Sequence, residues 1–142
     1  MIYTDNTRKA MILAYYAHQN QFDKSGVPYI YHPIHLAEQM DSEEECIVAL
    51  LHDIVEDTDV SFEDLEHDFS KEFVDAIRLL THNPEINYWD YVRTIKNNPL
   101  AKKVKIADLR HNSDLTRLLN PPEKILNKIQ NVYRQSIDIL TD

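Results

Sequence analysis

The sequence predicts a single all-α domain of about seven to eight helices, spanning residues 1–142. Only one glycine, Gly26, occurs in 142 residues, whereas all-β and dinucleotide-binding folds need glycines for their tight turns. Apolar residues recur at helical spacing along most of the chain, and serine and proline start signals separate the segments. The length suits one domain with a core of its own.

The first half of the chain is expected to form three helices. The first covers 7–18 and is followed by a polar loop over 19–28 that contains Gly26 and Pro28. His32-Pro33 opens the second helix, which runs through Met40, with the proline in the first turn where its missing N–H costs nothing. Ser42-Glu43-Glu44-Glu45 has the capping-box pattern and starts a third helix that we expect to end near Thr58.

The second half continues the pattern. Ser61-Phe62-Glu63-Asp64 is another capping box and starts a short helix to about Asp68. The remaining predicted helices are 70–81 with an apolar face of Phe73, Ile77 and Leu80; 87–97 with Tyr88, Trp89 and Tyr91; 99–119, closed by Pro121-Pro122; and 123–140 with the stripe Ile125, Ile129, Val132, Ile137 and Leu140.

Charge and cysteine content exclude several classes of protein. The formal net charge of −9 disfavours a non-specific nucleic-acid binder, which normally needs a basic face. The single Cys46 cannot form an internal disulfide and is expected to pack as a small apolar residue. No signal-peptide pattern or membrane-length apolar run is visible. We therefore expect a cytoplasmic protein without nucleic-acid or membrane partners; no feature sets its oligomeric state.

The segment 50–58 places four acid/base or metal-binding groups next to core residues. In a continuous helix, His52 stacks on Glu56 and Asp53 on Asp57, and all four fall within an arc of roughly 140°. Burying two carboxylates beside an imidazole is costly unless a cation or hydrogen-bond partners compensate them. A solvated acidic face is the alternative, but the adjacent His and Asp favour a ligand site.

Two other positions extend this set. His32 lies at the start of its helix, where its ring can project into a cleft; taken alone, it equally fits a capping or surface histidine. Asp108 lies on an apolar stripe with Val104, Leu115 and Leu119, within roughly 40° either side, and Asn112 follows one turn later. A buried Asp satisfied by backbone or Asn112 is the alternative for this position.

Together, His32, His52, Asp53 and Asp108 form a mixed nitrogen and oxygen set from three predicted helices. Such a set suits a divalent transition ion, with Mn²⁺, Fe²⁺ and Zn²⁺ as candidates. A metal of this kind polarises a phosphoryl group and acidifies its water. Glu56 and Asp57, one turn along, would be placed to take a proton or to orient the water.

Three segments carry a resemblance to a known family. They are 17–33 (AHQNQFDKSGVPYIYHP), 51–58 (LHDIVEDT) and 104–112 (VKIADLRHN). With the His32…His52-Asp53…Asp108 pattern, they resemble HD-domain metal-dependent phosphohydrolases, in particular the hydrolase branch of RelA/SpoT-type proteins that includes stand-alone small alarmone hydrolases. The resemblance covers about residues 10–140 and implies an HD-type helical bundle.

The resemblance also implies an activity and site roles. The activity is Mn²⁺-dependent removal of the 3′-pyrophosphate from guanosine penta- or tetraphosphate, a small nucleotide substrate. His32, His52, Asp53 and Asp108 match the metal ligands, and Glu56 and Asp57 match the pair that activates water and stabilises the transition state. The matches to nucleotide-contacting residues are Lys24, Ser25 and Asn112. Tyr88 and Tyr91 are looser candidates for the sugar and phosphate rim, and core packing fits them equally well. Lys105 is a candidate for a phosphate contact because of its angle to Asp108 on the helix.

Two other functions remain open at this point. Asp23, Val27 and Leu115 depart from the family pattern at the nucleotide end, which favours a second hypothesis: hydrolysis of another phosphorylated nucleotide or a dinucleotide phosphate. A non-catalytic nucleotide sensor is the third. Four further histidines are not expected to bind the metal. His35 is expected to be a surface or supporting residue and His18 a packing or loop-orienting residue, and His67 and His82 are poor candidates for a second metal.

Overall fold

The computed structural model describes residues 1–142 and confirms the all-α prediction, with helices throughout and no strand beyond one isolated bridge between Phe22 and Pro28. The helices are α1 (Asp5–Ala17), α2 (Tyr31–Glu38), α3 (Glu43–Leu51), α4 (Ile54–Asp57), α5 (Phe62–Asp68), α6 (Lys71–Leu80), α7 (Tyr88–Lys96), α8 (Pro99–Asn112), α9 (Glu123–Lys128) and α10 (Arg134–Thr141). None of them is both long and apolar enough to span a membrane.

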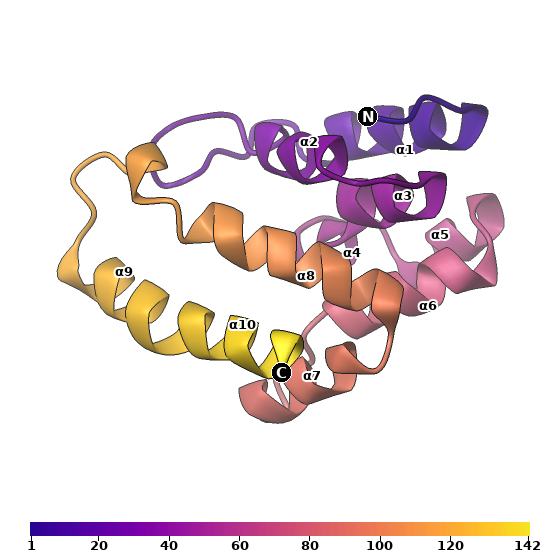
Figure 1. Cartoon of the computed structure of the whole chain (residues 1–142). Helices are drawn as coiled ribbons and strands as arrows, with labels where there is room; N and C mark the ends of the chain where they lie inside the picture. Colours follow the sequence, from indigo (N-terminus) through magenta and orange to yellow (C-terminus); the bar gives the residue numbers. More distant parts are fainter.

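Helix α3 forms the centre of the domain (Figure 1). Its residues Cys46 to Leu51 are all fully buried, and it packs against α1, α2, α6 and α8. Because a helix that is apolar on every side needs neighbours all round, α3 can only occupy the middle of the bundle. Cys46 is buried and free, as the sequence predicts. This central position brings the end of α3 next to α2 and α8.

Local start signals fix several boundaries correctly. At α5, Ser61 Oγ accepts from Asp64 N and the Asp64 carboxylate accepts from Ser61 N, so the predicted capping box is present. At α3 only half of the predicted box forms. Ser42 Oγ accepts from Glu45 N, but the Glu45 carboxylate accepts from Asp41 N and Lys103 Nζ instead. Helix α1 begins earlier than the predicted residue 7: Thr4 is its cap and forms a capping box with Thr7.

The predicted continuous helix from Ser42 to Thr58 is wrong. Helix α3 ends at Leu51, and Asp53 has φ −122° and ψ 16°, outside the helical region, before α4 begins at Ile54. The Ala49 carbonyl accepts from His52 Nδ1 at 2.8 Å, where an uninterrupted helix would offer it the Asp53 N–H. His52 and Asp53 therefore occupy a turn, and the predicted stacking of His52 on Glu56 does not occur.

The predicted helix from Pro99 to Leu119 is also too long. Helix α8 ends at Asn112, where Ser113 Oγ donates to the Leu109 carbonyl, and a 3₁₀ turn covers Leu115–Arg117. Leu115 and Leu119 are 52% and 76% exposed, so they do not share a buried stripe with Asp108. Val104 and Asp108 are buried as predicted.

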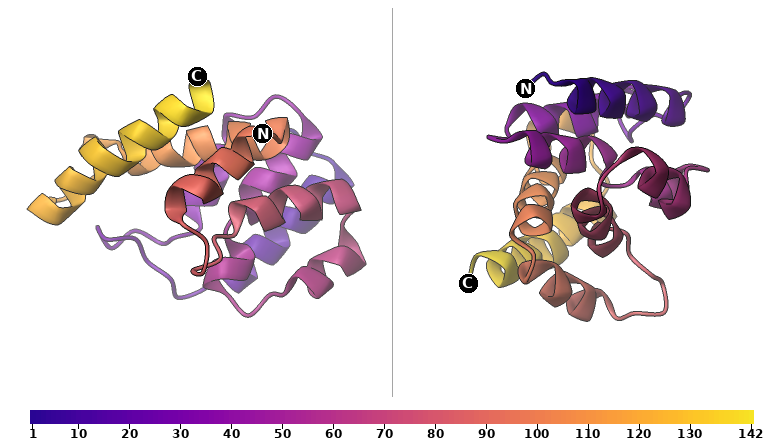
Figure 2. Two further views of the ribbon diagram at one scale, coloured as in Figure 1. Left: turned by 90° about the horizontal axis from the view of Figure 1, so that it is seen from below. Right: turned by 90° about the vertical axis from the view of Figure 1, so that its right-hand side faces the viewer.

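The last helix runs as one rod through α9, a π-helical segment (Ile129–Tyr133) and α10 (Figures 1 and 2). Of its predicted core stripe, Leu140 is fully buried, whereas Ile125, Ile129, Val132 and Ile137 are half-buried. The rod packs on α7 and α8 through α10, so its N-terminal part borders the site rather than the core. π-helical segments are frequent at functional sites.

Candidate active site

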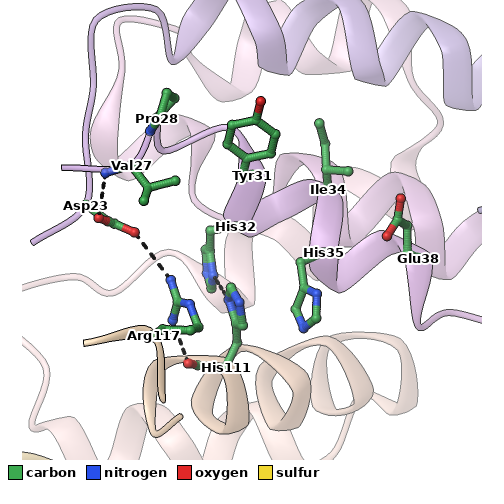
Figure 3. A pocket seen from close by; sticks show the side chains of 10 residues that line it. All are labelled: Asp23, Val27, Pro28, Tyr31, His32, Ile34, His35, Glu38, His111 and Arg117. Carbon is green, nitrogen blue, oxygen red and sulfur yellow. Dashed lines mark hydrogen bonds and ion pairs between the residues drawn. The ribbon is translucent and has the colours of Figure 1, made fainter. Parts of the chain in front are cut away.

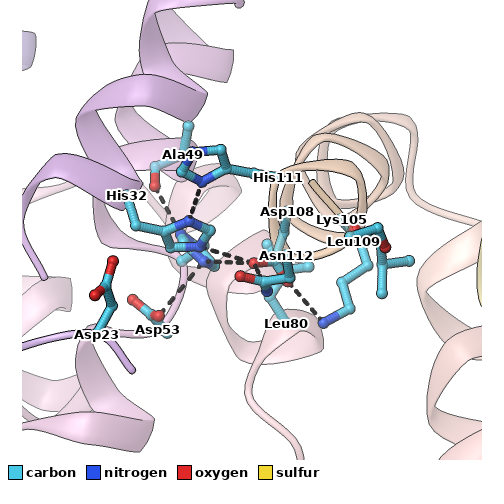
Figure 4. Close-up of polar contacts among 12 residues, drawn as sticks. Asp23, His32, Ala49, Asp53, Leu80, Lys105, Asp108, Leu109, His111 and Asn112 are labelled. Atoms are coloured by element: carbon cyan, nitrogen blue, oxygen red, sulfur yellow. Dashed lines mark hydrogen bonds and ion pairs between the residues drawn. The ribbon is translucent and has the colours of Figure 1, made fainter. Parts of the chain in front are cut away.

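The four predicted ligands meet where α2, the turn after α3, and α8 come together. Figure 4 labels three of them, His32, Asp53 and Asp108. His32 Nε2 lies 2.9 Å from Asp108 Oδ1, and His52 Nε2 lies 3.6 Å from the same oxygen. The turn after Leu51 places Asp53 beside His52, with Oδ2 3.5 Å from Nε2. Ligand atoms of His32, His52 and Asp53 all lie within 4.8 Å of one another.

Two atoms at this site lack partners. His18 Nε2 and Asp53 Oδ1 are buried without any hydrogen bond, and they lie 3.7 Å apart. Buried polar atoms are nearly always satisfied, so such atoms point to a missing ligand or ion. The Nδ1 atoms of His52 and His32 have partners: His52 Nδ1 donates to the Ala49 carbonyl, and His32 Nδ1 lies 2.7 Å from His111 Nδ1. The donor set therefore fits a divalent metal ion.

The two aspartates are in opposite electrostatic situations. Burial raises the pKa of Asp53 well above its usual range, and the nearby carboxylates of Asp108, Asp57 and Glu56 add to this. Burial alone would do the same to Asp108, but Lys105 and the two imidazoles of His32 and His52 hold its pKa well below the usual range. Of these two aspartates, only Asp108 has a lysine beside it, and Asp53 has no Lys or Arg partner.

The buried histidines favour the neutral form that binds metals. Burial lowers the pKa of His32 and of His18, and burial together with Arg117 and neighbouring histidines lowers the pKa of His111 to about 4. A neutral imidazole carries one N–H and one lone pair. Each of these rings therefore presents one nitrogen that can accept or ligate.

Lys105 and Asn112 are tied to Asp108. Lys105 Nζ donates to Asp108 Oδ2 at 3.0 Å, and Asn112 Nδ2 donates to Oδ1 at 3.0 Å. Burial alone would lower the pKa of Lys105, but Asp108 raises it. Both side chains line a cavity of about 420 Å³ that also contains His52, Asp53, Glu56 and Asp108.

The structure places the two predicted acid/base residues differently. Glu56 lines the cavity, and its Oε1 accepts from the His82 backbone N–H at 2.8 Å. Asp57 is exposed and is not among the residues lining the cavity. Its backbone carbonyl accepts from Gln21 Nε2, and Gln21 Oε1 lies 2.7 Å from His18 Nδ1. Gln21 therefore joins the predicted loop to Asp57, and His18 lies between Gln21 and Asp53.

The two predicted tyrosines line the cavity, but their hydroxyl groups already contact other residues of the protein. Tyr91 is buried, its hydroxyl donates to the Leu80 carbonyl, and burial raises its pKa to about 12. Tyr88 OH lies 3.0 Å from Ser136 Oγ. Tyr29 and Tyr133, which the sequence did not single out, also line the cavity.

A second cavity of about 280 Å³ shares Tyr29, Asn112 and Tyr133 with the first. It contains Lys24 and is otherwise lined by Phe22, Asp23, Arg117, Leu118 and Ile125. Ser25 does not line it. Instead its Oγ donates to the Arg117 carbonyl and accepts from Leu119 N, joining the 19–28 loop to the segment after α8.

The surroundings of His67, His82 and His35 agree with roles outside the metal site. His67 is 89% exposed beside Asp68, and His82 Nε2 bonds the Ile86 carbonyl. His35 stacks on His111 with ring centroids 4.0 Å apart. His111 itself was missed by the sequence reasoning, although its spacing of three residues from Asp108 places it near the same helix face.

A profile of the HD domain matches residues 10–113, most of the chain. The chain belongs to the HD-domain family.

Three curated relatives of this HD domain show how it compares. The bifunctional (p)ppGpp synthase/hydrolase SpoT of Escherichia coli K12 is 27% identical over 93% of this chain and 20% of its own length. The guanosine-3′,5′-bis(diphosphate) 3′-pyrophosphohydrolase of Vibrio cholerae is 41% identical over the same two shares. The Drosophila melanogaster pyrophosphohydrolase MESH1 is 34% identical over 63% of this chain and 56% of its length.

A solved structure is also similar to this chain. It is reported as a metazoan orthologue of SpoT that hydrolyses ppGpp, and it superposes on this HD domain with a TM-score of 0.77 at 25% identity, covering 99% of this chain and 88% of that chain. This HD domain thus spans about a fifth of the long bacterial relatives but nearly all of the solved one. The family and the His/Asp cluster together indicate a divalent metal.

Proposed function

We propose that this HD domain hydrolyses the 3′-pyrophosphate of guanosine tetra- and pentaphosphate, (p)ppGpp, and releases pyrophosphate. One observation carries the proposal: the cavity beside the His/Asp cluster shares three lining residues with a more apolar second cavity. A nucleotide 3′-diphosphate needs a charged compartment for its phosphates and an aromatic one for its base. The names of the relatives, including SpoT and MESH1, support the choice of substrate.

In this proposal the metal is Mn²⁺, with Fe²⁺ and Zn²⁺ as alternatives, and its ligands are His32, His52, Asp53 and Asp108. The unpartnered oxygen of Asp53 and the closeness of the ligand atoms of His32, His52 and Asp53, all within 4.8 Å of one another, support that set. When bound, such an ion supplies Lewis-acid chemistry at a phosphoryl group. Asp108 receives three hydrogen-bonding contacts, from His32, Lys105 and Asn112, which fix the orientation of its carboxylate.

Glu56 and Asp57 are proposed to handle water and its proton. Glu56 is supported by its place on the cavity wall and by the His82 N–H that orients its carboxylate. Asp57 is supported by its exposed carboxylate, which lies close enough to Asp53 to raise the pKa of that group. A general acid or base needs to be near the reacting atoms and free to exchange protons. Glu56 lines the cavity, and Asp57 lies beside it with an exposed carboxylate.

The substrate contacts are proposed as two groups. Lys105, Asn112 and Tyr88 line the charged cavity and would face the phosphates and the sugar, while Lys24 would lie near the base in the second cavity. Lys128, also on the charged wall and exposed, adds a cation that the sequence reasoning did not name. The hydrogen bonds of Ser25 and Tyr91 indicate that these two act by holding the loop and the wall in place.

A second candidate is hydrolysis of a different phosphorylated nucleotide. It is favoured by Asp23, whose carboxylate accepts from Ser25 N and Val27 N and lies 3.6 Å from Arg117 Nη2. This ion pair lies on the wall of the second cavity and places an acidic group there. The base preference of this cavity is therefore the point on which the two candidates differ.

A substrate panel tests the proposal. The protein with added Mn²⁺ is given guanosine 3′,5′-bis(diphosphate), its adenosine counterpart and a dinucleotide phosphate, with phosphate and pyrophosphate measured separately. The proposal predicts pyrophosphate release from the guanosine compound at the highest kcat/KM. Release of phosphate from another nucleotide, with none from the guanosine compound, would favour the second candidate.

A further inference from the structure

The two nitrogens of His32 face different surroundings. Nε2 lies inside the cluster, 2.9 Å from Asp108 Oδ1, and Nδ1 lies 2.7 Å from Nδ1 of His111 on the far side of the ring (Figure 4). The two rings are nearly parallel, with an interplanar angle of 10° and centroids 5.0 Å apart. His32 is 5% exposed, so its ring is largely shielded from bulk water.

A contact between two imidazole nitrogens holds one hydrogen. At 2.7 Å one Nδ1 must donate and the other must accept, so the tautomers of His32 and His111 are coupled. If His32 carries its hydrogen on Nδ1, its Nε2 lone pair is free for an ion and His111 accepts. If His111 donates, His32 carries its hydrogen on Nε2 and bonds Asp108.

We propose that His111 is a positioning residue that sets the metal-binding tautomer of His32. The inference rests on the metal ligands of the proposed function, but not on the identity of the nucleotide. Metal-ligating histidines nearly always donate their second N–H to an acceptor that fixes the ring. His52 uses the Ala49 carbonyl in this way, whereas His32 meets an imidazole, which can either donate or accept.

The choice of an imidazole has a consequence for the metal-free site. The carboxylate of Asp108 is an acceptor. With no metal bound it would accept a hydrogen bond from His32 Nε2–H, and His111 would then donate to His32 through Nδ1. On metal binding, His32 Nε2 gives its hydrogen to solvent, the Nδ1 hydrogen shifts from His111 to His32, and His111 Nε2 takes up one hydrogen from solvent. The number of hydrogens on the pair is unchanged, so neither ring becomes charged.

His111 is placed to make that exchange. Its side chain lines a cavity of about 490 Å³ whose lining includes His32, His35 and Arg117 but not Asp53 (Figure 3). No hydrogen bond occupies its Nε2 atom. Arg117 Nη1 donates to the His111 carbonyl at 2.6 Å, and His35 stacks on the outer face of the ring at 4.0 Å. The ring is therefore held in place while one nitrogen stays open to water.

Three variants and one spectroscopic measurement test the proposal. His111→Phe keeps an aromatic ring but removes the hydrogen-bonding nitrogen, His111→Asn restores a group that donates or accepts, and His35→Phe keeps the stack without touching His32. Affinity for Zn²⁺, measured by competition with a chromogenic chelator, is expected to fall about 10- to 100-fold in His111→Phe. It should recover to within a few fold in His111→Asn and stay unchanged in His35→Phe.

The tautomer is read directly in the wild-type protein by ¹⁵N NMR of the histidine rings, with diamagnetic Zn²⁺ as the probe. We expect the His32 hydrogen on Nε2 without metal and on Nδ1 with zinc bound. Wild-type zinc affinity in His111→Phe, or a zinc-bound His32 without hydrogen on Nδ1, would overturn the proposal. The NMR result stands even if a variant fails to fold, and no readout uses a nucleotide, so failure of the proposed substrate is distinguishable.

Discussion

His18 Nε2 and Asp53 Oδ1 lie 3.7 Å apart in the interior, and neither has a hydrogen-bond partner. The Gln21 amide explains the state of the imidazole. Its Nε2 donates to the Asp57 carbonyl, so its Oε1 can only accept from His18 Nδ1–H. A neutral His18 therefore presents a bare Nε2 lone pair toward a carboxylate oxygen. Two buried acceptors facing each other are costly unless a proton or cation lies between them or beside them.

The raised pKa of Asp53 predicts a pH-dependent stability in the metal-free protein. The folded state keeps the Asp53 proton above the ordinary aspartate pKa of 3.8, where the unfolded chain has lost it. The folded state then binds more protons, so the free energy of unfolding falls as pH rises from 3.8 toward the raised pKa. Urea titrations in chelator measure the free energy of unfolding of wild type and of Asp53→Asn. The wild-type value minus the variant value should fall as pH rises over this range. Parallel curves for the two proteins would contradict it.

Removing the cation beside Asp108 should be strongly destabilising. Lys105 and Asp108 are 15% and 9% exposed in their side chains and lie 3.0 Å apart. Lys105→Met leaves a buried charge without its partner, at a cost of about 3–5 kcal/mol in the free energy of unfolding. Lys103→Met is the matched control on the same helix. Its partners Asp41 and Glu45 are more exposed, so we expect about 1 kcal/mol or less. Equal losses in the two variants would refute this account of Lys105.

The proposed role of Asp57 predicts a separation between turnover and metal content. Asp57→Ala should lower kcat by about 10²-fold or more, the usual contribution of a general acid or base, while the bound metal stays near the wild-type amount. Metal content by atomic spectroscopy and pyrophosphate release measure the two effects. Retained turnover would remove Asp57 from the proposed machinery.

Ser25 is expected to act on substrate binding rather than chemistry. Its hydroxyl joins the Arg117 carbonyl and Leu119 N, so Ser25→Ala frees the loop that carries Lys24. We expect a higher KM with a nearly unchanged kcat, and a loss of about 1–2 kcal/mol in the free energy of unfolding for two hydrogen bonds. Ser70→Ala serves as control, because Ser70 makes no side-chain capping bond. An unchanged KM in Ser25→Ala would argue against a binding role for this loop.

The parts of the fold that could be predicted are those set by neighbouring residues. The start of α5 depends on Ser61 and Asp64, three residues apart, and both bonds of that box form. The break after Leu51 was not predictable from the pattern, because Ile54 and Val55 continue the helical spacing. At the break, the His52 ring donates to the Ala49 carbonyl, a side-chain contact that the apolar pattern does not reveal.

The same division holds for the site. The adjacent His52 and Asp53, and an aspartate at 108 among apolar residues, were visible as candidate ligands because charged groups in core segments need compensation. His111 was not, since its contact with His32 joins positions 79 residues apart. Tyr133 was missed for a related reason: aromatic residues are ordinary in helices, and only the packing of the last helix brings it to the cavity. Tyr29 lies in the turn before α2, where nothing in the local pattern marks it.

The central claim is that the His/Asp cluster holds a metal needed for pyrophosphate release. The most direct test is the rate of pyrophosphate release from guanosine 3′,5′-bis(diphosphate) by wild type and Asp53→Asn, each with Mn²⁺ and with excess chelator. The account predicts release by wild type with Mn²⁺, loss of release in chelator, and little release by Asp53→Asn in either condition. Release that persists in chelator, or in Asp53→Asn at the wild-type rate, would contradict it.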